Sequence, residues 1–110
     1  MKRTIKKLLK ENCRVYVYLS DKDVAKRFLQ HAENEGFTFG DGAKPTSGEC
    51  DSIMAVNENA TINYVGVAGR IAFGCAEKIG DKKLMRVDYN KYISGDENYI
   101  MNRNLGNADV

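Results

Sequence analysis

The sequence has little proline, little histidine and no tryptophan. Its 110 residues include one proline and one histidine, and 43% are hydrophobic. Such a composition predicts a folded chain, and this length predicts one domain. Because His31 is the sole histidine, a site with several histidine ligands is excluded. Its place beside an apolar helical stripe favours a packed or surface histidine over a catalytic one.

Cysteine is also scarce. Cys13, Cys50 and Cys75 stand alone, with no C-x-x-C pair, which excludes a zinc knuckle or a thioredoxin-like dithiol. We expect reduced thiols and a cytoplasmic protein. Cys50 lies between Glu49 and Asp51, whose carboxylates disfavour a reactive thiolate. Carboxylates occur, but none are placed by spacing as a general acid and base. We therefore expect a protein that is not an enzyme, with no catalytic residue, no cofactor and no metal.

Long apolar runs are missing. No segment approaches the roughly 18 to 20 apolar residues that a membrane span requires. The basic N-terminus lacks the apolar centre of a signal peptide. The sequence therefore predicts no membrane association.

The positive charge is concentrated at one end. Residues 1–14 carry one acidic side chain and six basic ones, which are Lys2, Arg3, Lys6, Lys7, Lys10 and Arg14. Ile5, Leu8 and Leu9 follow helical spacing and predict a short basic helix over residues 2–11. Two interpretations are open. The basic residues bind nucleic acid or another anionic surface, or the apolar stripe docks on the body of the protein, which we favour.

The clearest local pattern is a strand followed by a helix. RVYVYL at 14–19 alternates, with valines and leucine on one side and Arg14, Tyr16 and Tyr18 on the other. Residues 20–35 carry an apolar stripe after Ser20, which we predict as the helix cap, and Gly36 stands where the helix would stop.

Further elements complete an α+β prediction. We expect a short strand at 37–39, a hairpin from 53–56 and 61–65, a last strand at 84–89 and a short closing element at 89–93. Residues 66–78 stay open between helix and strand. The predicted fold is a small, mainly antiparallel sheet with the helix at about 20–35 packed on one face and all helices on that side. Residues 1–12 form the basic helix, 13–93 the core and 94–110 a tail.

The stretch FGDGAKPTSGEC, residues 39–50, raises the question of a phosphate-binding loop. A P-loop requires G-x-x-x-x-G-K-[ST] before a helix, whereas Gly42 is followed by Ala43, and Pro45 separates Lys44 from Thr46. That identity is excluded. Two interpretations remain: a wide turn, which we favour, and an anion site built from Lys44, Thr46, Ser47 and backbone amides.

An RNA-binding alternative rests on the aromatic strand. VYVYLS at 15–20 is similar to the first motif of an RNA-recognition domain, in which exposed aromatics such as Tyr16 and Tyr18 would stack on bases. The second motif of such a domain is matched only weakly, by residues Arg70–Phe73. The same tyrosines could equally face a partner protein or be covered by the N-terminal helix.

Several motifs together resemble a family. Ala32 to Phe37 matches A-x-x-x-G-[FY], residues 42–46 read G-x-K-P-T, a hairpin follows, and residues 87–92 read VDYNKY. This order, over about residues 13–93, resembles small accessory proteins of bacteriophages and mobile elements. Those relatives usually carry an aromatic such as tryptophan in the strand before the loop, which Phe37 and Phe39 replace here.

The resemblance implies a function by binding. Such proteins block a host defence complex, as anti-CRISPR proteins do, or sequester a signalling nucleotide. We therefore expect a non-catalytic inhibitor whose partner is a host defence protein or a signalling nucleotide, with nucleic acid as the alternative. The residues that would bind are Tyr16, Tyr18, Lys44, Thr46, Ser47 and Arg70, and their pocket could lie across a homo-oligomer interface.

Overall fold

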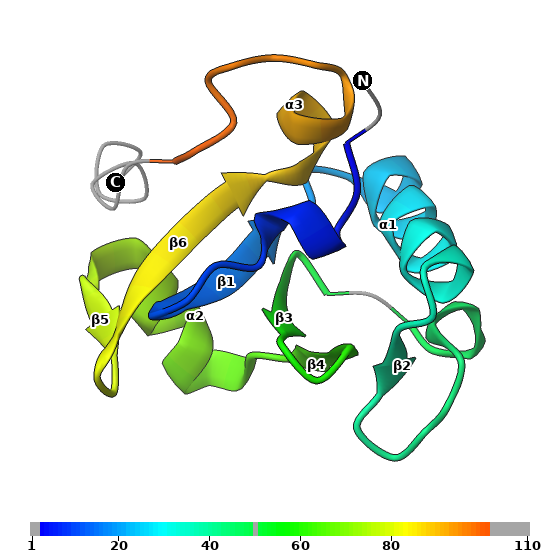
Figure 1. Cartoon of the computed structure of the whole chain (residues 1–110), viewed down its shortest axis with the longest axis horizontal. Coiled ribbons are helices and arrows are strands. Elements are labelled where there is room, and N and C mark those ends of the chain that lie inside the picture. The colour runs from blue at the N-terminus through cyan, green and yellow to red at the C-terminus, as the bar shows by residue number, and fades with distance from the viewer. Residues whose placement is uncertain (1–2, 50, 102–110) are drawn as a thin grey trace.

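The computed structural model describes residues 3–49 and 51–101, and its centre is a mixed six-stranded sheet (Figure 1). Its strands run in the order β2-β4-β3-β1-β6-β5. Their bounds are β1 Cys13–Tyr18, β2 Thr38–Phe39, β3 Ile53–Asn57, β4 Thr61–Tyr64, β5 Lys78–Ile79 and β6 Lys82–Asp88. β1 runs antiparallel to β3 and parallel to β6. The α+β prediction is confirmed, and so are the hairpin and the last strand.

The helices account for most of the remaining chain. They are α1 Lys22–Asn34, α2 Gly66–Cys75 and α3 Tyr89–Ile93, with two single 3-10 turns, η1 Lys6–Leu8 and η2 Pro45–Ser47. The prediction left residues 66–78 open, and the structure has a helix over most of that stretch. No helix in the described residues is long and apolar enough to cross a membrane.

The alternation of β1 divides the core between the two faces of the sheet. Val15 and Val17 point toward α1 and join a cluster with Phe28 and Ala32 of that helix. Tyr16 points the other way. This is the division that the alternating sequence predicts.

The cap of α1 lies one residue after the predicted one. The Asp21 carboxylate, not the Ser20 hydroxyl, accepts a hydrogen bond from the Val24 amide at 2.9 Å. Gly36, at φ +89°, turns the chain out of the helix, as predicted.

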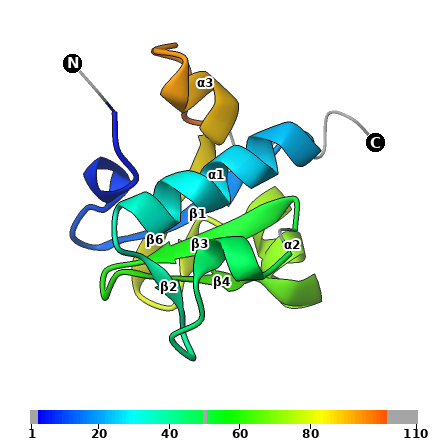
Figure 2. The ribbon, with the colours of Figure 1, turned by 90° about the vertical axis from the view of Figure 1, so that its right-hand side faces the viewer.

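The two long helices cover opposite faces, which corrects the expectation that all helices share one side (Figure 2). On the face away from α1, Phe73 and Ala76 pack with Tyr16, Ala55 and Leu84. The sequence of α2 conceals this because its glycines weaken the helical pattern. Gly69 is buried in the first turn of α2, and a Cβ there would lie 2.3 Å from the Cβ of Val65, the residue that caps this helix.

The N-terminal segment forms one 3-10 turn, not a helix over residues 2–11. Ile5 and Leu8 are nevertheless fully buried in the core, so the docked-stripe interpretation is confirmed. The Glu35 carboxylate accepts the backbone amides of Ile5 at 2.8 Å and Lys6 at 3.1 Å. These hydrogen bonds fix the segment at the end of α1.

The far end of the described chain returns to the edge of β6. The Asp88 amide donates to the Tyr99 carbonyl, and the Met101 amide donates to the Arg86 carbonyl, so the chain around Ile100 pairs with Val87. In Figure 1 this orange segment descends beside β6. It therefore extends the sheet at the edge where β5 pairs only with the first residues of β6.

Candidate functional site

The glycine-rich loop is a tight structure with its own internal contacts. Phe39 bonds to Gly42 and Ala43 through the backbone, with Gly42 at φ +88°. Pro45 begins the 3-10 turn η2, as its fixed φ allows. A Cβ at Gly48 would lie 2.7 Å from the Phe39 ring, so only glycine lets the chain pass there without displacing the ring.

The anion that this loop holds belongs to the protein itself. Thr46 donates its amide at 3.2 Å and its hydroxyl at 2.6 Å to the same oxygen of Glu33, on α1. These hydrogen bonds, together with the nearby Lys44 charge, lower the pKa of Glu33 below its usual range. The Ser47 hydroxyl donates to the Lys44 carbonyl. The loop is therefore a turn latched to α1, which supports the favoured interpretation.

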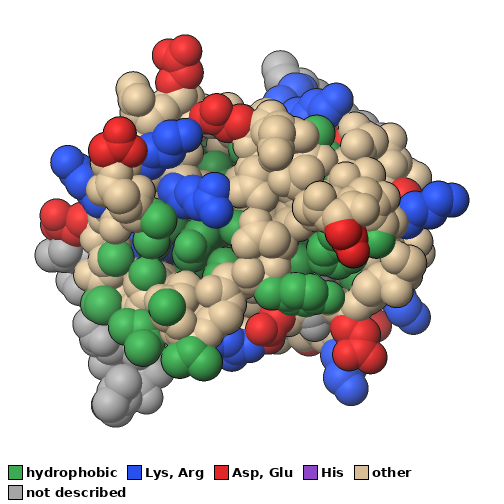
Figure 3. All heavy atoms as spheres, turned by 90° about the horizontal axis from the view of Figure 1, so that it is seen from below, with side chains coloured by type: hydrophobic (Ala, Val, Ile, Leu, Met, Phe, Trp, Pro, Cys, Tyr) green, Lys and Arg blue, Asp and Glu red, His purple; other side chains and the backbone are tan. Residues whose placement is uncertain are grey.

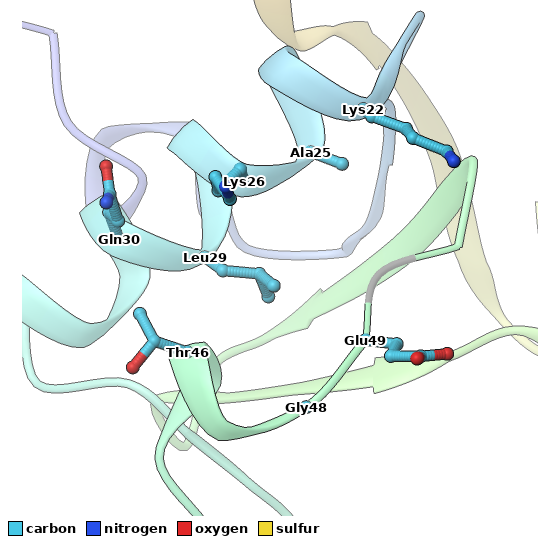
Figure 4. A pocket seen from close by; sticks show the side chains of 8 residues that line it. All are labelled: Lys22, Ala25, Lys26, Leu29, Gln30, Thr46, Gly48 and Glu49. Atoms are coloured by element: carbon cyan, nitrogen blue, oxygen red, sulfur yellow. The ribbon is translucent and has the colours of Figure 1, made fainter.

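A groove of about 510 Å³ lies between α1 and this loop (Figure 4). Its lining residues are Lys22, Ala25, Lys26, Leu29, Gln30, Thr46, Gly48 and Glu49. The Glu49 carboxylate shares the groove with the two lysines, which reduces their attraction for an external anion. Thr46 is the one predicted binding residue that lines it.

The other predicted binding residues are not brought into one pocket. Tyr16 is 6% exposed beneath α2, and Tyr18 packs against Phe73 with ring centroids 6.4 Å apart. Arg70 lies on α2, where its guanidinium forms an ion pair with Asp51. The hydrogen bond that Arg70 donates within this ion pair lowers the pKa of the Asp51 carboxyl. The sheet face that would stack bases in an RNA-recognition domain is therefore covered at Tyr16.

The basic N-terminal residues have separate roles. Arg3 donates to the backbone carbonyls of Tyr92 at 3.0 Å and Asp96 at 2.9 Å, and its guanidinium lies 5.0 Å from the Tyr99 ring centre. Arg14 donates to the Asn57 side chain at 2.7 Å. Lys6, Lys7 and Lys10 are exposed, while Lys2 lies outside the described residues. Two of the six predicted nucleic-acid contacts thus bind the protein's own chain.

His31 is packed, as the sequence predicts. Its Nδ1 lies 2.6 Å from the hydroxyl of Tyr89, a buried residue of α3 whose pKa is raised by burial. Within residues 3–49 and 51–101, no group of three histidine, cysteine or acidic side chains could hold a metal ion.

The most distinctive surface is the outer face of α2, which the sequence did not single out. Val67 is 77% exposed and Ile71, one turn later, is 63% exposed; Ala68 and Cys75 are exposed on the same helix. Figure 3 views the molecule from the lower side of Figure 1, where α2 lies, and hydrophobic side chains gather on that face. α2 is therefore apolar on its inner and its outer side. The available signal was an apolar segment without amphipathic period, which is typical of a helix buried all round.

Arg86 holds this helix in place from the sheet. This charged residue of β6 is 5% exposed, and its guanidinium donates to the carbonyls of Ala72, Phe73 and Ala76. A cation at the C-terminal end of a helix also complements the helix dipole. The apolar outer face is thus presented on a firmly anchored element.

Comparisons with known proteins add no relative. No protein family model matches the chain, and no match is found among curated proteins or solved structures.

Proposed function

We propose that the protein acts by binding another protein through the outer face of α2, and not by catalysis. The observation that carries this proposal is the exposure of Val67 and Ile71 on a helix that is already apolar on its inner side. Exposed apolar patches on a folded domain commonly mark interaction surfaces. Anchors at positions i and i+4 are also the pattern by which a helix enters a groove of its partner.

The shape of the surface favours a concave partner. At about 1.5 Å per residue, the ten residues of α2 span roughly 15 Å, and their outer side chains alone fall short of the ~800 Å² per partner that a stable interface buries. A partner with an apolar groove would enclose the helix from three sides. Two convex copies of α2 meeting face to face would bury less, so a different protein is the occupant that we propose.

The resemblance to phage and mobile-element accessory proteins suggests the kind of partner. We propose a host defence protein, whose inhibition follows from occupation of its groove. Sequestration of a nucleotide has less support, because the residues predicted for it do not line one pocket; they are Tyr16, Tyr18, Lys44, Thr46 and Arg70.

The test is a matched comparison of surface variants. The protein is used to capture partners from a bacterial lysate, the captured protein is purified, and its Kd is measured for each variant. Val67→Ser/Ile71→Ser is expected to weaken binding at least tenfold, with an unchanged melting temperature because both side chains are exposed. Ile100→Ser, which removes a 51% exposed side chain elsewhere, is the control.

Three results would contradict the proposal. The first is equal partner affinity for the α2 variant and the wild type. The second is an equal loss of affinity in the control Ile100→Ser, and the third is that the wild-type protein captures no partner. A dimer in light scattering that the α2 variant dissociates would instead assign the face to a second copy of the chain.

A further inference from the structure

A second groove, of about 690 Å³, lies on the α1 side of the sheet where α1 does not reach. Its floor is formed by β6 and the start of β1, and its walls by β5, residues before β1 and the segment at 99–101. The lining residues are Lys10, Cys13, Glu77, Lys78, Lys83, Leu84, Met85, Arg86, Tyr99, Ile100 and Met101. This volume falls in the range of about 300 to 1,000 Å³ typical of small-molecule sites.

Three lysines from three separate segments meet at this groove. Lys78 on β5 and Lys83 on β6 are directly opposite in the antiparallel register, and both are exposed. Lys10 reaches the groove from the residues before β1. Like charges directly opposite across two strands repel, so the arrangement costs folding energy without an anion.

Two other basic residues near this sheet already have partners within the protein. Lys82, the neighbour of Lys83, lies 3.6 Å from Glu58, and Arg86 is occupied by the carbonyls of α2. No ion pair joins Lys10, Lys78 or Lys83 to an acidic side chain of residues 3–49 or 51–101. The Glu77 carboxylate also lines the groove and offsets one of these charges, so the three ammonium groups still leave the groove with an excess of positive charge for a ligand.

The groove also has an apolar part. Met85 and Met101 line it, with Tyr99 at its wall. Methionine side chains pack well against flat aromatic rings. A ligand that joins a flat apolar ring system to a multiply charged anion would match both parts.

We propose that this groove binds a nucleoside phosphate, with its phosphates at Lys10, Lys78 and Lys83 and its base on the methionine-lined floor. The three lysines line one bounded volume, which suits a small molecule better than a nucleic-acid strand. This site is independent of the α2 face and shares no residue with it.

The experiment measures binding of ATP, AMP and a single-stranded oligouridylate to the full chain by calorimetry at low and moderate salt. ATP is expected to bind more tightly than AMP, and affinity should fall as salt rises, because the contact is largely ionic. Lys78→Gln/Lys83→Gln should weaken ATP binding at least tenfold. The control Lys22→Gln/Lys26→Gln removes the same charge on α1 and should change affinity less than twofold.

Defined outcomes would overturn the proposal. They are no ATP binding at millimolar concentration, equal loss in both double variants, or binding of the oligouridylate without binding of ATP. Melting temperatures of both double variants, measured without ligand, show whether each is folded.

Discussion

Thr46 donates both its backbone amide and its hydroxyl to one carboxylate oxygen of Glu33, at 3.2 and 2.6 Å. These hydrogen bonds join the loop at 39–49 to α1, between residues thirteen positions apart in the sequence. They also explain why a glycine-rich stretch with a lysine and two hydroxyl residues resembles an anion site, because the anion it holds is a side chain of the same protein.

This latch predicts a specific pH dependence. Because both hydrogen bonds favour the ionised carboxylate, the folded-state pKa of Glu33 lies below its ordinary value of 4.5. Its contribution to stability is therefore fully present above pH 4.5 and lost as pH falls through the folded-state pKa. Thr46→Val should raise the pKa of Glu33 toward 4.5 in a carboxyl NMR titration. Ser47→Ala is the control, since that hydroxyl bonds to Lys44, and equal pKa values in Thr46→Val and wild type would contradict the latch.

The anchor of α2 predicts a larger effect on stability. Arg86→Met keeps the packing beside Phe73 but leaves three carbonyl groups of α2 without their buried donor. We expect a loss of about 2 to 3 kcal/mol in the free energy of unfolding, measured by urea denaturation. Amide hydrogen exchange should accelerate most at the end of α2. Arg86→Lys keeps the positive charge but lacks the planar guanidinium, so its free energy of unfolding should lie between those of the wild type and Arg86→Met. If the α2 amides of Arg86→Met exchange as slowly as those of the wild type, Arg86 does not anchor the helix.

The opposed lysines predict a stabilising substitution. Lys78→Glu places a negative charge directly opposite Lys83, where two positive charges now repel each other. The free energy of unfolding should therefore rise by about 0.2 to 1 kcal/mol at low salt. The gain should shrink in 1 M salt, where the charges are screened. Lys26→Glu, an exposed position on α1, gives the matched change in net charge. An equal gain in both variants would show that net charge, and not the pair, is responsible.

Local patterns predicted much of this fold because their causes are local. The alternation at Val15, Tyr16 and Val17 assigns faces within one strand, and Gly36 ends α1 through its own backbone. The cap was misplaced by one residue because Ser20 and Asp21 are both good caps, and only the entry angle of the chain selects between them.

The features that the sequence did not predict depend on contacts between segments that are distant in the chain. The N-terminal stripe predicted burial of Ile5 and Leu8, but its helix is shortened to one turn whose amides are satisfied by Glu35, thirty positions away. Tyr16 is covered because α2 returns across the sheet. The predicted binding residues failed to meet for the same reason: Arg70 and Thr46 lie on elements whose relative position no spacing encodes.

Gly69 tests the packing of the first turn of α2 against its capping residue, because two effects oppose each other there. Alanine in a helix interior is favoured over glycine by about 1 kcal/mol, but a Cβ at this position would lie 2.3 Å from the Cβ of Val65. Overpacking of this kind costs about 1 to 3 kcal/mol, so Gly69→Ala should lower the free energy of unfolding. Gly74→Ala, in the same helix with no atom within 4 Å of the added Cβ, should raise it.

The compensating variant separates the clash from any other cause. In a Val65→Gly background the Val65 Cβ and both of its methyl carbons, which would lie 2.3 to 3.5 Å from the added Cβ, are removed, so adding Gly69→Ala should cost less than it does in the wild type. Urea denaturation of the four proteins in this cycle gives the coupling between the two positions directly. Additive changes would mean that the side chains at positions 65 and 69 do not touch within the first turn of α2.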